Sequence, residues 1–152
     1  MSLKERIGED IKTAMKAKDQ AALRALRAVK SAILLAETAE GRNPDAPLTE
    51  AEELQLLQKQ VKQRRDSVEQ FTANGRADLA QTELEEAEVI ARYLPQALSE
   101  AELETALLAI IAQVGAVGVQ DLGKVMKEAS TRLAGRADNK AVSELTRKLL
   151  SA

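Results

Sequence analysis

The chain has no cysteine and no histidine among its 152 residues. Without cysteine there can be no disulfide and no thiol nucleophile, and without histidine the commonest side-chain base is missing. Cysteine and histidine are also the usual zinc ligands. We therefore predict neither a metal site nor a cofactor, and we identify no catalytic residue.

Aromatic residues and long apolar runs are equally scarce. Phe71 and Tyr93 are the only aromatics and there is no tryptophan, so the core must be aliphatic. No apolar run is long enough to span a bilayer, and the chain starts with a charged amphipathic pattern instead of a signal peptide. We expect a cytoplasmic protein with no membrane contact.

Strong helix formers dominate what is present, namely Ala, Leu, Glu, Lys, Gln and Arg. Hydrophobic residues make up 45% and charged residues 30%, which is typical of a folded globular protein. This composition predicts an all-α fold. Because the net charge is -2, any nucleic-acid binding would need a local basic patch.

Helix starts and stops can be located from capping residues. Capping boxes are expected at Ser2, Thr49 and Ser99, and simple N-caps at Asp19, Asp121 and Asp138. Stops are expected at Gly41, Asn74-Gly75, Pro95 and Gly135. Together with the apolar periodicity, these residues predict helices over residues 2–17, 19–40, 49–73, 78–94, 99–114, 121–134 and 138–150.

Short connections between the first four helices predict a pair of antiparallel helical hairpins. Pro95 ends the last of them, and a new helix cap follows at Ser99. We therefore expect a helical N-terminal domain over residues 1–95. A small C-terminal three-helix domain should follow over residues 96–152.

One charged pair is expected inside the second hairpin. If the Asn74-Gly75 turn sets the register, Arg64 interrupts one apolar seam opposite Glu86, with Glu83 one turn away. We predict that Arg64 pairs with Glu86 or Glu83. Such a pair usually fixes helix register and need not take part in chemistry.

A near-match to a nucleotide-binding P-loop lies at residues 118–125. The segment fits the pattern G-x-x-x-x-G-K, but Val125 stands where the magnesium-binding Ser or Thr belongs. Asp121 would place a carboxylate against the triphosphate, and no strand accompanies the segment. We reject the nucleotide-binding interpretation.

Basic residues are concentrated near the C-terminus. From Asp121 onward there are seven Lys or Arg residues against four Asp or Glu residues. Gly123 and Lys124 fall in the first turn of a predicted helix, where free backbone N–H groups and the helix dipole can hold a phosphate. Gly135 and Arg136 fall in the following turn. An ordinary solvated surface would show similar charges, so composition alone does not decide.

The same region resembles the tail domain of GatB, a subunit of tRNA-dependent amidotransferases. The matching segments are Leu122-Gly123-Lys124-Val125-Met126-Lys127 and Leu133-Ala134-Gly135-Arg136-Ala137-Asp138. Nearly the whole chain is similar to the YqeY family, which carries that tail behind a helical domain. Further matching segments are residues 10–16, Leu26-Arg27, Lys62-Gln63-Arg64 with Ser67, residues 75–79 and Tyr93-Leu94-Pro95.

The resemblance implies a link to glutamine-dependent carbon–nitrogen ligation on tRNA. It points to a tRNA contact at five residues: Gly123, Lys124, Lys127, Gly135 and Arg136. GatB's catalytic domain has no counterpart here, so ligase activity would require a partner, such as an amidotransferase or aminoacyl-tRNA synthetase component. We expect a tRNA-binding accessory module. The alternative is a protein–protein adaptor that uses the N-terminal hairpins without contacting RNA.

Overall fold

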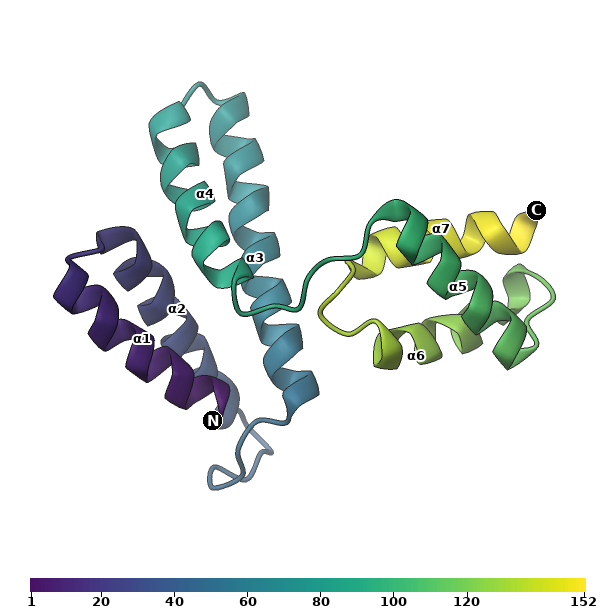
Figure 1. Ribbon diagram of the computed structural model, residues 1–152, viewed down its shortest axis with the longest axis horizontal. Helices are drawn as coiled ribbons and strands as arrows, with labels where there is room; N and C mark the ends of the chain where they lie inside the picture. Colours follow the sequence, from purple (N-terminus) through teal and green to yellow (C-terminus); the bar gives the residue numbers. More distant parts are fainter. The chain divides into compact units, whose positions relative to one another are not determined.

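A computed structural model describes residues 1–152, and the chain is entirely helical with no strand (Figure 1). The all-α prediction is confirmed. The elements are α1 (Leu3–Ala17), α2 (Gln20–Glu37), α3 (Glu50–Ala73), α4 (Ala77–Ala91), α5 (Glu100–Val114), the 3-10 helix η1 (Val119–Asp121), α6 (Leu122–Arg132) and α7 (Asn139–Ser151). The chain divides into two compact units, Met1–Leu94 (unit 1) and Pro95–Ala152 (unit 2).

Helix ends in unit 1 follow the local capping rules. Ser2 and Thr49 each form the expected capping box, and the Asp19 side chain accepts a hydrogen bond from the Ala22 N–H. The end of α2 differs from prediction, since the helix stops at Glu37 and not at residue 40. Thr38 leaves the helical conformation there, and its hydroxyl donates to the Leu34 carbonyl at 2.8 Å, which satisfies one end carbonyl.

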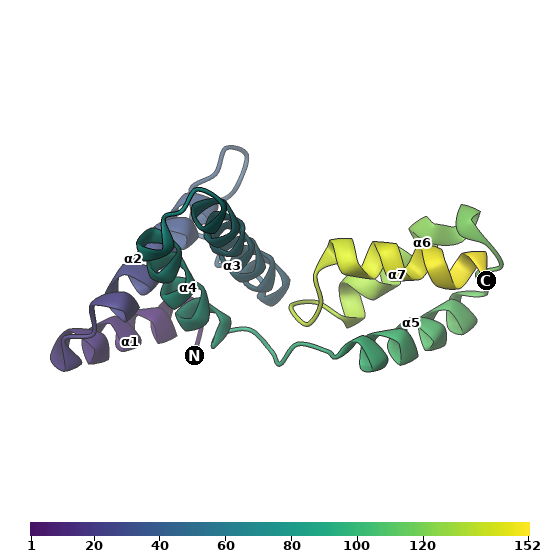
Figure 2. The same cartoon turned by 90° about the horizontal axis from the view of Figure 1, so that it is seen from above.

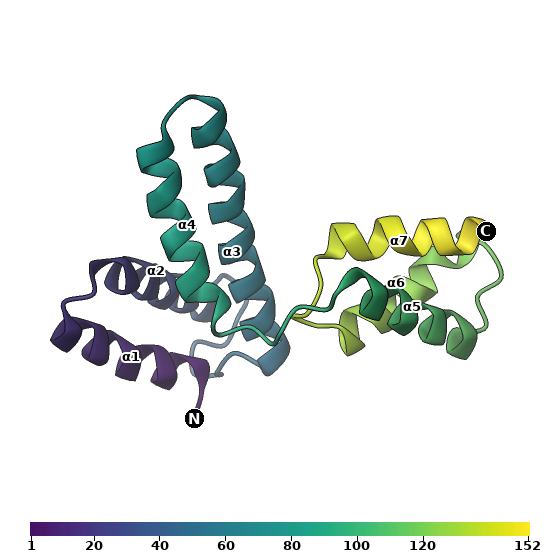
Figure 3. The ribbon, with the colours of Figure 1, turned by 45° about the horizontal axis from the view of Figure 1, so that its top comes forward.

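The four helices of unit 1 pack around an aliphatic core. α1 lies against α2, α3 lies along α4, and α2 contacts both α3 and α4. Figures 1 and 3 show the α3–α4 hairpin extending well beyond α1 and α2. The core therefore lies at the end of the α3–α4 hairpin that packs against α1 and α2. Its most deeply buried large side chains are Ile7, Val29, Ile33, Leu57 and Ile90.

Arg64 and Glu86 face each other inside the α3–α4 hairpin. Arg64 Nε lies 3.8 Å from Glu86 Oε1, and both side chains are only 13% exposed. Arg64 Nη1 also donates to the side-chain oxygen of Gln60 at 2.7 Å. The structure forms this pair with Glu86 and forms no ion pair between Arg64 and Glu83. Its placement agrees with the register set by the Asn74-Gly75 turn.

Other polar contacts tie the helices of unit 1 to one another. Lys4 of α1 pairs with Glu37 of α2 at 3.2 Å, and Arg24 of α2 lies 3.5 Å from Glu85 of α4. The backbone N–H of Leu3 donates to a Glu53 carboxylate oxygen at 2.9 Å. Charged side chains thus link each helix of unit 1 to another one.

Unit 2 is built from α5, α6 and α7 around its own apolar core (Figure 2). Leu107, Ile110 and Val125 are essentially inaccessible to solvent. Thr146 is the buried polar residue, and its hydroxyl donates to the Val142 carbonyl one turn earlier at 2.6 Å. The three helices therefore meet at an aliphatic interface whose polar group is satisfied internally.

Helix starts in unit 2 agree only partly with the sequence. Ser99 forms its capping box, and Asp121 and Asp138 stand at the N-cap positions of α6 and α7 as predicted, but neither aspartate makes a side-chain capping bond. Asp121 Oδ2 instead accepts from the Val117 N–H at 3.0 Å. The chain enters α6 through η1, so the aspartate already lies inside a helical turn when α6 begins.

No single helix of the chain is both long enough and apolar enough to cross a membrane. One bent pair, α5 with η1 and α6, reaches the required length and apolar character. Its apolar residues form part of the core of unit 2, with Leu103, Leu107 and Val125 buried there.

Candidate functional site

Three of the residues predicted to contact tRNA share one face of α6. Val125 and Ala129 point into the core, and the helical repeat places Gly123, Lys124 and Lys127 on the opposite side. All three of the latter are exposed to solvent, and the Lys124 side chain is 69% exposed. We call these residues (Gly123, Lys124 and Lys127) the α6 stripe.

Gly123 has no visible structural reason to be a glycine. A Cβ atom added there would meet nothing within 4 Å, and its φ is not in the left-handed region. Glycine inside a helix costs up to about 1 kcal/mol relative to alanine. The missing side chain leaves the backbone open to close approach from solvent.

The first turn of α6 is less ready to bind an anion than the sequence indicated. The Leu122 N–H is already bonded to the Val119 carbonyl within η1. Asp121 Oδ1 lies 3.8 Å from Lys124 Nζ and so places a negative charge beside the lysine. Phosphate binding at this point would depend on the lysine side chains more than on free backbone N–H groups.

Gly135 and Arg136 have structural roles in the turn between α6 and α7. Gly135 is buried and adopts a φ of 77°, a left-handed conformation that favours glycine. Arg136 Nε donates to the Gln96 carbonyl at 3.1 Å, and its own carbonyl accepts from the Leu98 N–H at 3.0 Å. Arg136 thereby fastens this turn to the segment that leads into α5.

The structure does not bring the five residues into one site. The α5–α6 loop and the α6–α7 turn lie at opposite ends of unit 2 (Figures 1 and 3). Lys124 and Leu133 are nine residues apart, which corresponds to about 13 Å along a helix. Gly123, Lys124 and Lys127 therefore form one group, and Gly135 and Arg136 form another.

Charge is unevenly distributed within unit 2. The unit has seven basic and seven acidic residues, but three of the acids, Glu100, Glu102 and Glu104, lie in the first part of α5. All seven basic residues belong to α6, α7 or the turn between them. α6 and α7 contact each other, which brings the two helices that carry the positive charge together. Counting charges from Asp121 onward detected the basic excess but missed the acidic α5.

The other titratable cluster joins α1 to the end of α4. The Tyr93 hydroxyl donates to Asp10, and the Arg6 guanidinium lies 5.1 Å from the centre of the Tyr93 ring. Burial and the nearby Asp10 carboxylate raise the pKa of Tyr93 well above its ordinary value. The cluster connects two helices and contains no nucleophile with an adjacent base. No group of three Asp or Glu side chains in the chain is arranged to hold a metal ion.

Comparison with known proteins gives several similar relatives, each named "Altered inheritance of mitochondria protein 41, mitochondrial". The protein from Pyrenophora tritici-repentis is 31% identical over 150 residues, covering 97% of this chain and 80% of its own. That from Saccharomyces cerevisiae strain YJM789 is 36% identical over 96 residues, covering 62% of this chain and 50% of its own. That from Lachancea thermotolerans is 38% identical over 99 residues, covering 63% and 51%.

The names of these relatives contradict the cytoplasmic location predicted from the sequence. They describe mitochondrial proteins, so the comparison points to mitochondria and the cytoplasmic prediction is wrong. The prediction rested on composition and on the charged start of the chain, neither of which reports a compartment. The match to the two yeast relatives spans about half of their length.

A family model described as "Yqey-like protein" matches residues 4–150, which is nearly the whole chain. The match extends through both units and includes the α6 stripe and the Arg136 turn. Together with the Pyrenophora relative, it establishes that this chain belongs to the YqeY family.

Proposed function

We propose that this YqeY-family chain is a tRNA-binding accessory module linked to glutamine-dependent carbon–nitrogen ligation. The observation that carries the proposal is the α6 stripe. Its glycine and two lysines are exposed and have no evident task in the fold, whereas Gly135 and Arg136 do. The resemblance of this segment to the GatB tail makes tRNA the favoured polyanion.

Electrostatics support a polyanion at this face. Lys127 forms no ion pair, and Lys124 is paired only with Asp121 of the preceding turn at 3.8 Å. Lys140, Arg147 and Lys148 of α7 form no ion pair either and add positive charge to the same unit. Each lysine that neutralises a phosphate releases a bound counterion, so affinity should fall steeply with salt.

The chain has no evident active site of its own. Any ligase activity would belong to a complex with an amidotransferase or aminoacyl-tRNA synthetase component, in which this chain supplies RNA affinity. In that arrangement its lysines position the tRNA backbone and carry little sequence information, because phosphate contacts do not read bases.

The test is a tRNA-binding titration of the full chain at several salt concentrations. The double variant Lys124→Ala with Lys127→Ala should bind more weakly and lower the salt-dependence slope by about 1 to 2. The matched control is Lys12→Ala with Lys16→Ala, which removes two exposed lysines one turn apart on α1. If both double variants lose affinity equally, the binding is non-specific and the proposed face is wrong.

Two single variants separate binding from folding. Gly123→Ala should leave the free energy of unfolding unchanged or raise it by up to about 1 kcal/mol, because the added Cβ meets no other atom of the chain. The same methyl group should weaken tRNA binding, because it keeps the RNA away from the backbone. Arg136→Ala should lower the stability of unit 2 by about 1 kcal/mol without changing the salt slope. If Arg136→Ala reduced the salt dependence of tRNA binding, Arg136 would be shown to contact RNA phosphates.

The alternative is a protein–protein adaptor with no RNA contact. It predicts that purified chain shows no salt-dependent tRNA affinity at all. Recovery of a protein partner without RNA would favour it. The observation behind this alternative is a groove in unit 1.

A further inference from the structure

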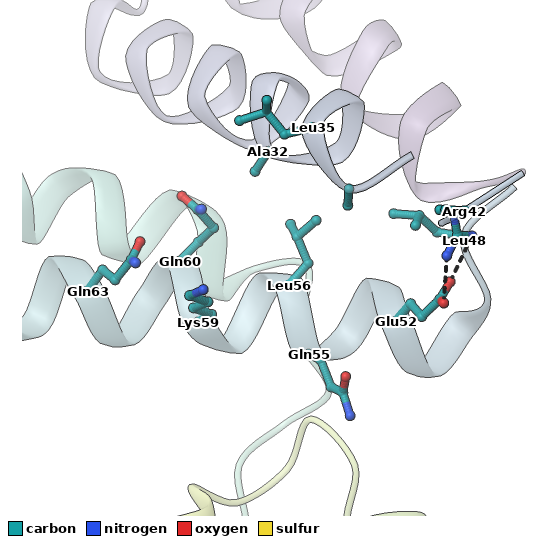
Figure 4. A pocket seen from close by; sticks show the side chains of 11 residues that line it. Ala32, Leu35, Arg42, Leu48, Glu52, Gln55, Leu56, Lys59, Gln60 and Gln63 are labelled. Atoms are coloured by element: carbon teal, nitrogen blue, oxygen red, sulfur yellow. Dashed lines mark hydrogen bonds and ion pairs between the residues drawn. The ribbon is translucent and has the colours of Figure 1, made fainter. Parts of the chain in front are cut away.

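The groove lies between α2 and α3 of unit 1 and has a volume of about 430 Å³ (Figure 4). Ala32 and Ala36 of α2, Leu56 of α3 and Leu48 of the preceding loop give it an apolar lining. Its volume lies within the range of ordinary ligand-binding pockets and can accept large side chains.

One end of the groove and its α3 edge are polar. Arg42 and Glu52 close one end, where Arg42 Nη1 donates to Glu52 Oε1 at 2.8 Å and Nη2 donates to Oε2 at 3.1 Å. Gln60 and Gln63 lie along the α3 edge, and their amides can both donate and accept hydrogen bonds. An apolar floor with a polar rim is typical of protein interfaces.

One leucine is exposed beside this floor, since Leu35 lines the groove and is 73% exposed. Single exposed leucines are ordinary on a protein surface. Here Leu35 borders a hollow with an apolar lining, so a partner that covered it would bury a continuous apolar area.

The charge around the groove is positive. Glu37, the only acidic residue of α2, is already paired with Lys4. Lys59 lines the groove, is exposed and forms no ion pair. Glu52 is neutralised by Arg42, whose hydrogen bond is the largest cause of the lowered pKa of the Glu52 carboxyl. The complementary surface would be acidic.

We propose that this groove binds an acidic amphipathic helix of a protein partner. A helix laid between α2 and α3 would place large apolar side chains, spaced three and four residues apart, against the alanine and leucine floor. Its acidic side chains would face Lys59. This binding is separate from RNA contact at the α6 stripe, which lies in the other unit.

A nucleic acid fits this groove less well than a helix does. Unstacked bases usually pack on aromatic rings. Phe71 and Tyr93 are the only aromatic residues of the chain, and neither lines the groove. Its apolar contacts come from alanine and leucine, which suit aliphatic side chains.

The test uses the full chain and two fluorescent 18-residue helical peptides. Both carry leucines at helical spacing, but one has glutamates and the other lysines on its polar face. Only the acidic peptide should bind, and Leu35→Ser should weaken it by about tenfold, since a central apolar anchor commonly contributes this much. Lys59→Glu should also weaken it and make the complex less sensitive to salt.

Leu108→Ser is the matched control, because Leu108 is an exposed leucine of α5, 50% exposed, in the other unit. It should leave peptide affinity unchanged, as should Lys124→Ala with Lys127→Ala, which separates this proposal from the RNA proposal. Failure of the acidic peptide to bind, or equal binding of both peptides, would overturn the proposal. Competition by single-stranded RNA would also overturn it, if Leu35→Ser abolished that competition. A dimer of the chain that Leu35→Ser dissociates would overturn it as well.

Discussion

Unit 1 and unit 2 use their charged residues differently. In unit 1, three ion pairs connect separate helices, Lys4 with Glu37, Arg24 with Glu85 and Arg64 with Glu86, beside local pairs such as Glu9 with Lys12. In unit 2, the ion pairs join neighbours along the chain, Asp121 with Lys124 and Glu128 with Arg132. Unit 1 therefore uses some of its charged residues to hold its helices together, whereas the ion pairs of unit 2 join residues only three or four positions apart.

The difference indicates where a polyanion can bind without disturbing the fold. Removing a cation from an inter-helix pair leaves a carboxylate behind and loosens the packing. Removing an exposed lysine of α6 costs little, because no other helix depends on it. Unit 2 also relies on a smaller apolar core and on backbone contacts, such as those of Arg136 with Gln96 and Leu98.

The largest expected effect tests whether the two cores are independent. Leu107→Ala in unit 2 and Leu57→Ala in unit 1 each truncate a leucine that is at most 1% exposed, and each should cost about 2–5 kcal/mol. Unit 2 spans 58 residues and unit 1 spans 94, so the smaller core should fail first. Amide hydrogen exchange should show Leu107→Ala losing protection in residues 95–152 alone.

Leu57→Ala serves as the control for that measurement. It should reduce protection in unit 1 while unit 2 keeps its wild-type exchange rates. If either variant lowered protection across both units together, the chain would unfold as one cooperative body, and the comparison between units would fail.

A smaller effect tests the inter-helix pairs of unit 1. Arg64→Ala should lower the free energy of unfolding by about 2 kcal/mol, because it strands the largely buried Glu86 carboxylate without its partner. Its exposed neighbour provides the control, since Arg65→Ala should change stability by less than about 0.5 kcal/mol. Urea denaturation measures both variants. Equal stabilities for the two would mean that the Arg64 pair contributes nothing beyond surface charge.

The smallest effect concerns alkaline pH and Tyr93. Because burial and Asp10 raise the pKa of Tyr93, the folded state keeps its phenol proton at a pH where the unfolded chain loses it. This contribution to stability is complete below the ordinary tyrosine pKa of about 10 and is lost as pH rises above it. Tyr93→Phe removes the titrating group, so its melting temperature should fall less than that of wild type between pH 8 and pH 11.

Lysine residues also deprotonate in that range, but they do so in both proteins, so only the difference between the two pH profiles is informative. Parallel profiles would show that Tyr93 titrates alike in the folded and unfolded states.

The sequence predicted much of the local structure and less of the candidate site. Capping boxes at Ser2, Thr49 and Ser99 formed as expected, since each depends on residues three positions apart. Asp121 and Asp138 stand at the predicted N-cap positions but make no side-chain capping bond, and ahead of α6 the chain already forms a helical turn. Capping preference cannot anticipate a 3-10 helix that absorbs the capping residue.

The tRNA-contact prediction grouped residues by their order in the chain. Lys124 lies in the first turn of α6 and Arg136 lies in the turn that follows α6, so most of the length of α6 separates them. The role of Arg136 depends on Gln96, which is 40 residues away, and no local pattern reveals that hydrogen bond. The groove likewise depends on how residues 32–36 pack beside residues 56–63.

By itself the sequence determined the helical class, most helix ends and the family of this protein, because these follow from periodicity, capping and matched residues along the chain. Only the tertiary structure decided which charges are used to hold helices together and which remain exposed. It also decided that a groove forms between α2 and α3. The physical reason is that ion pairs, buried contacts and hollows arise between helices, where distance in space is independent of distance in sequence.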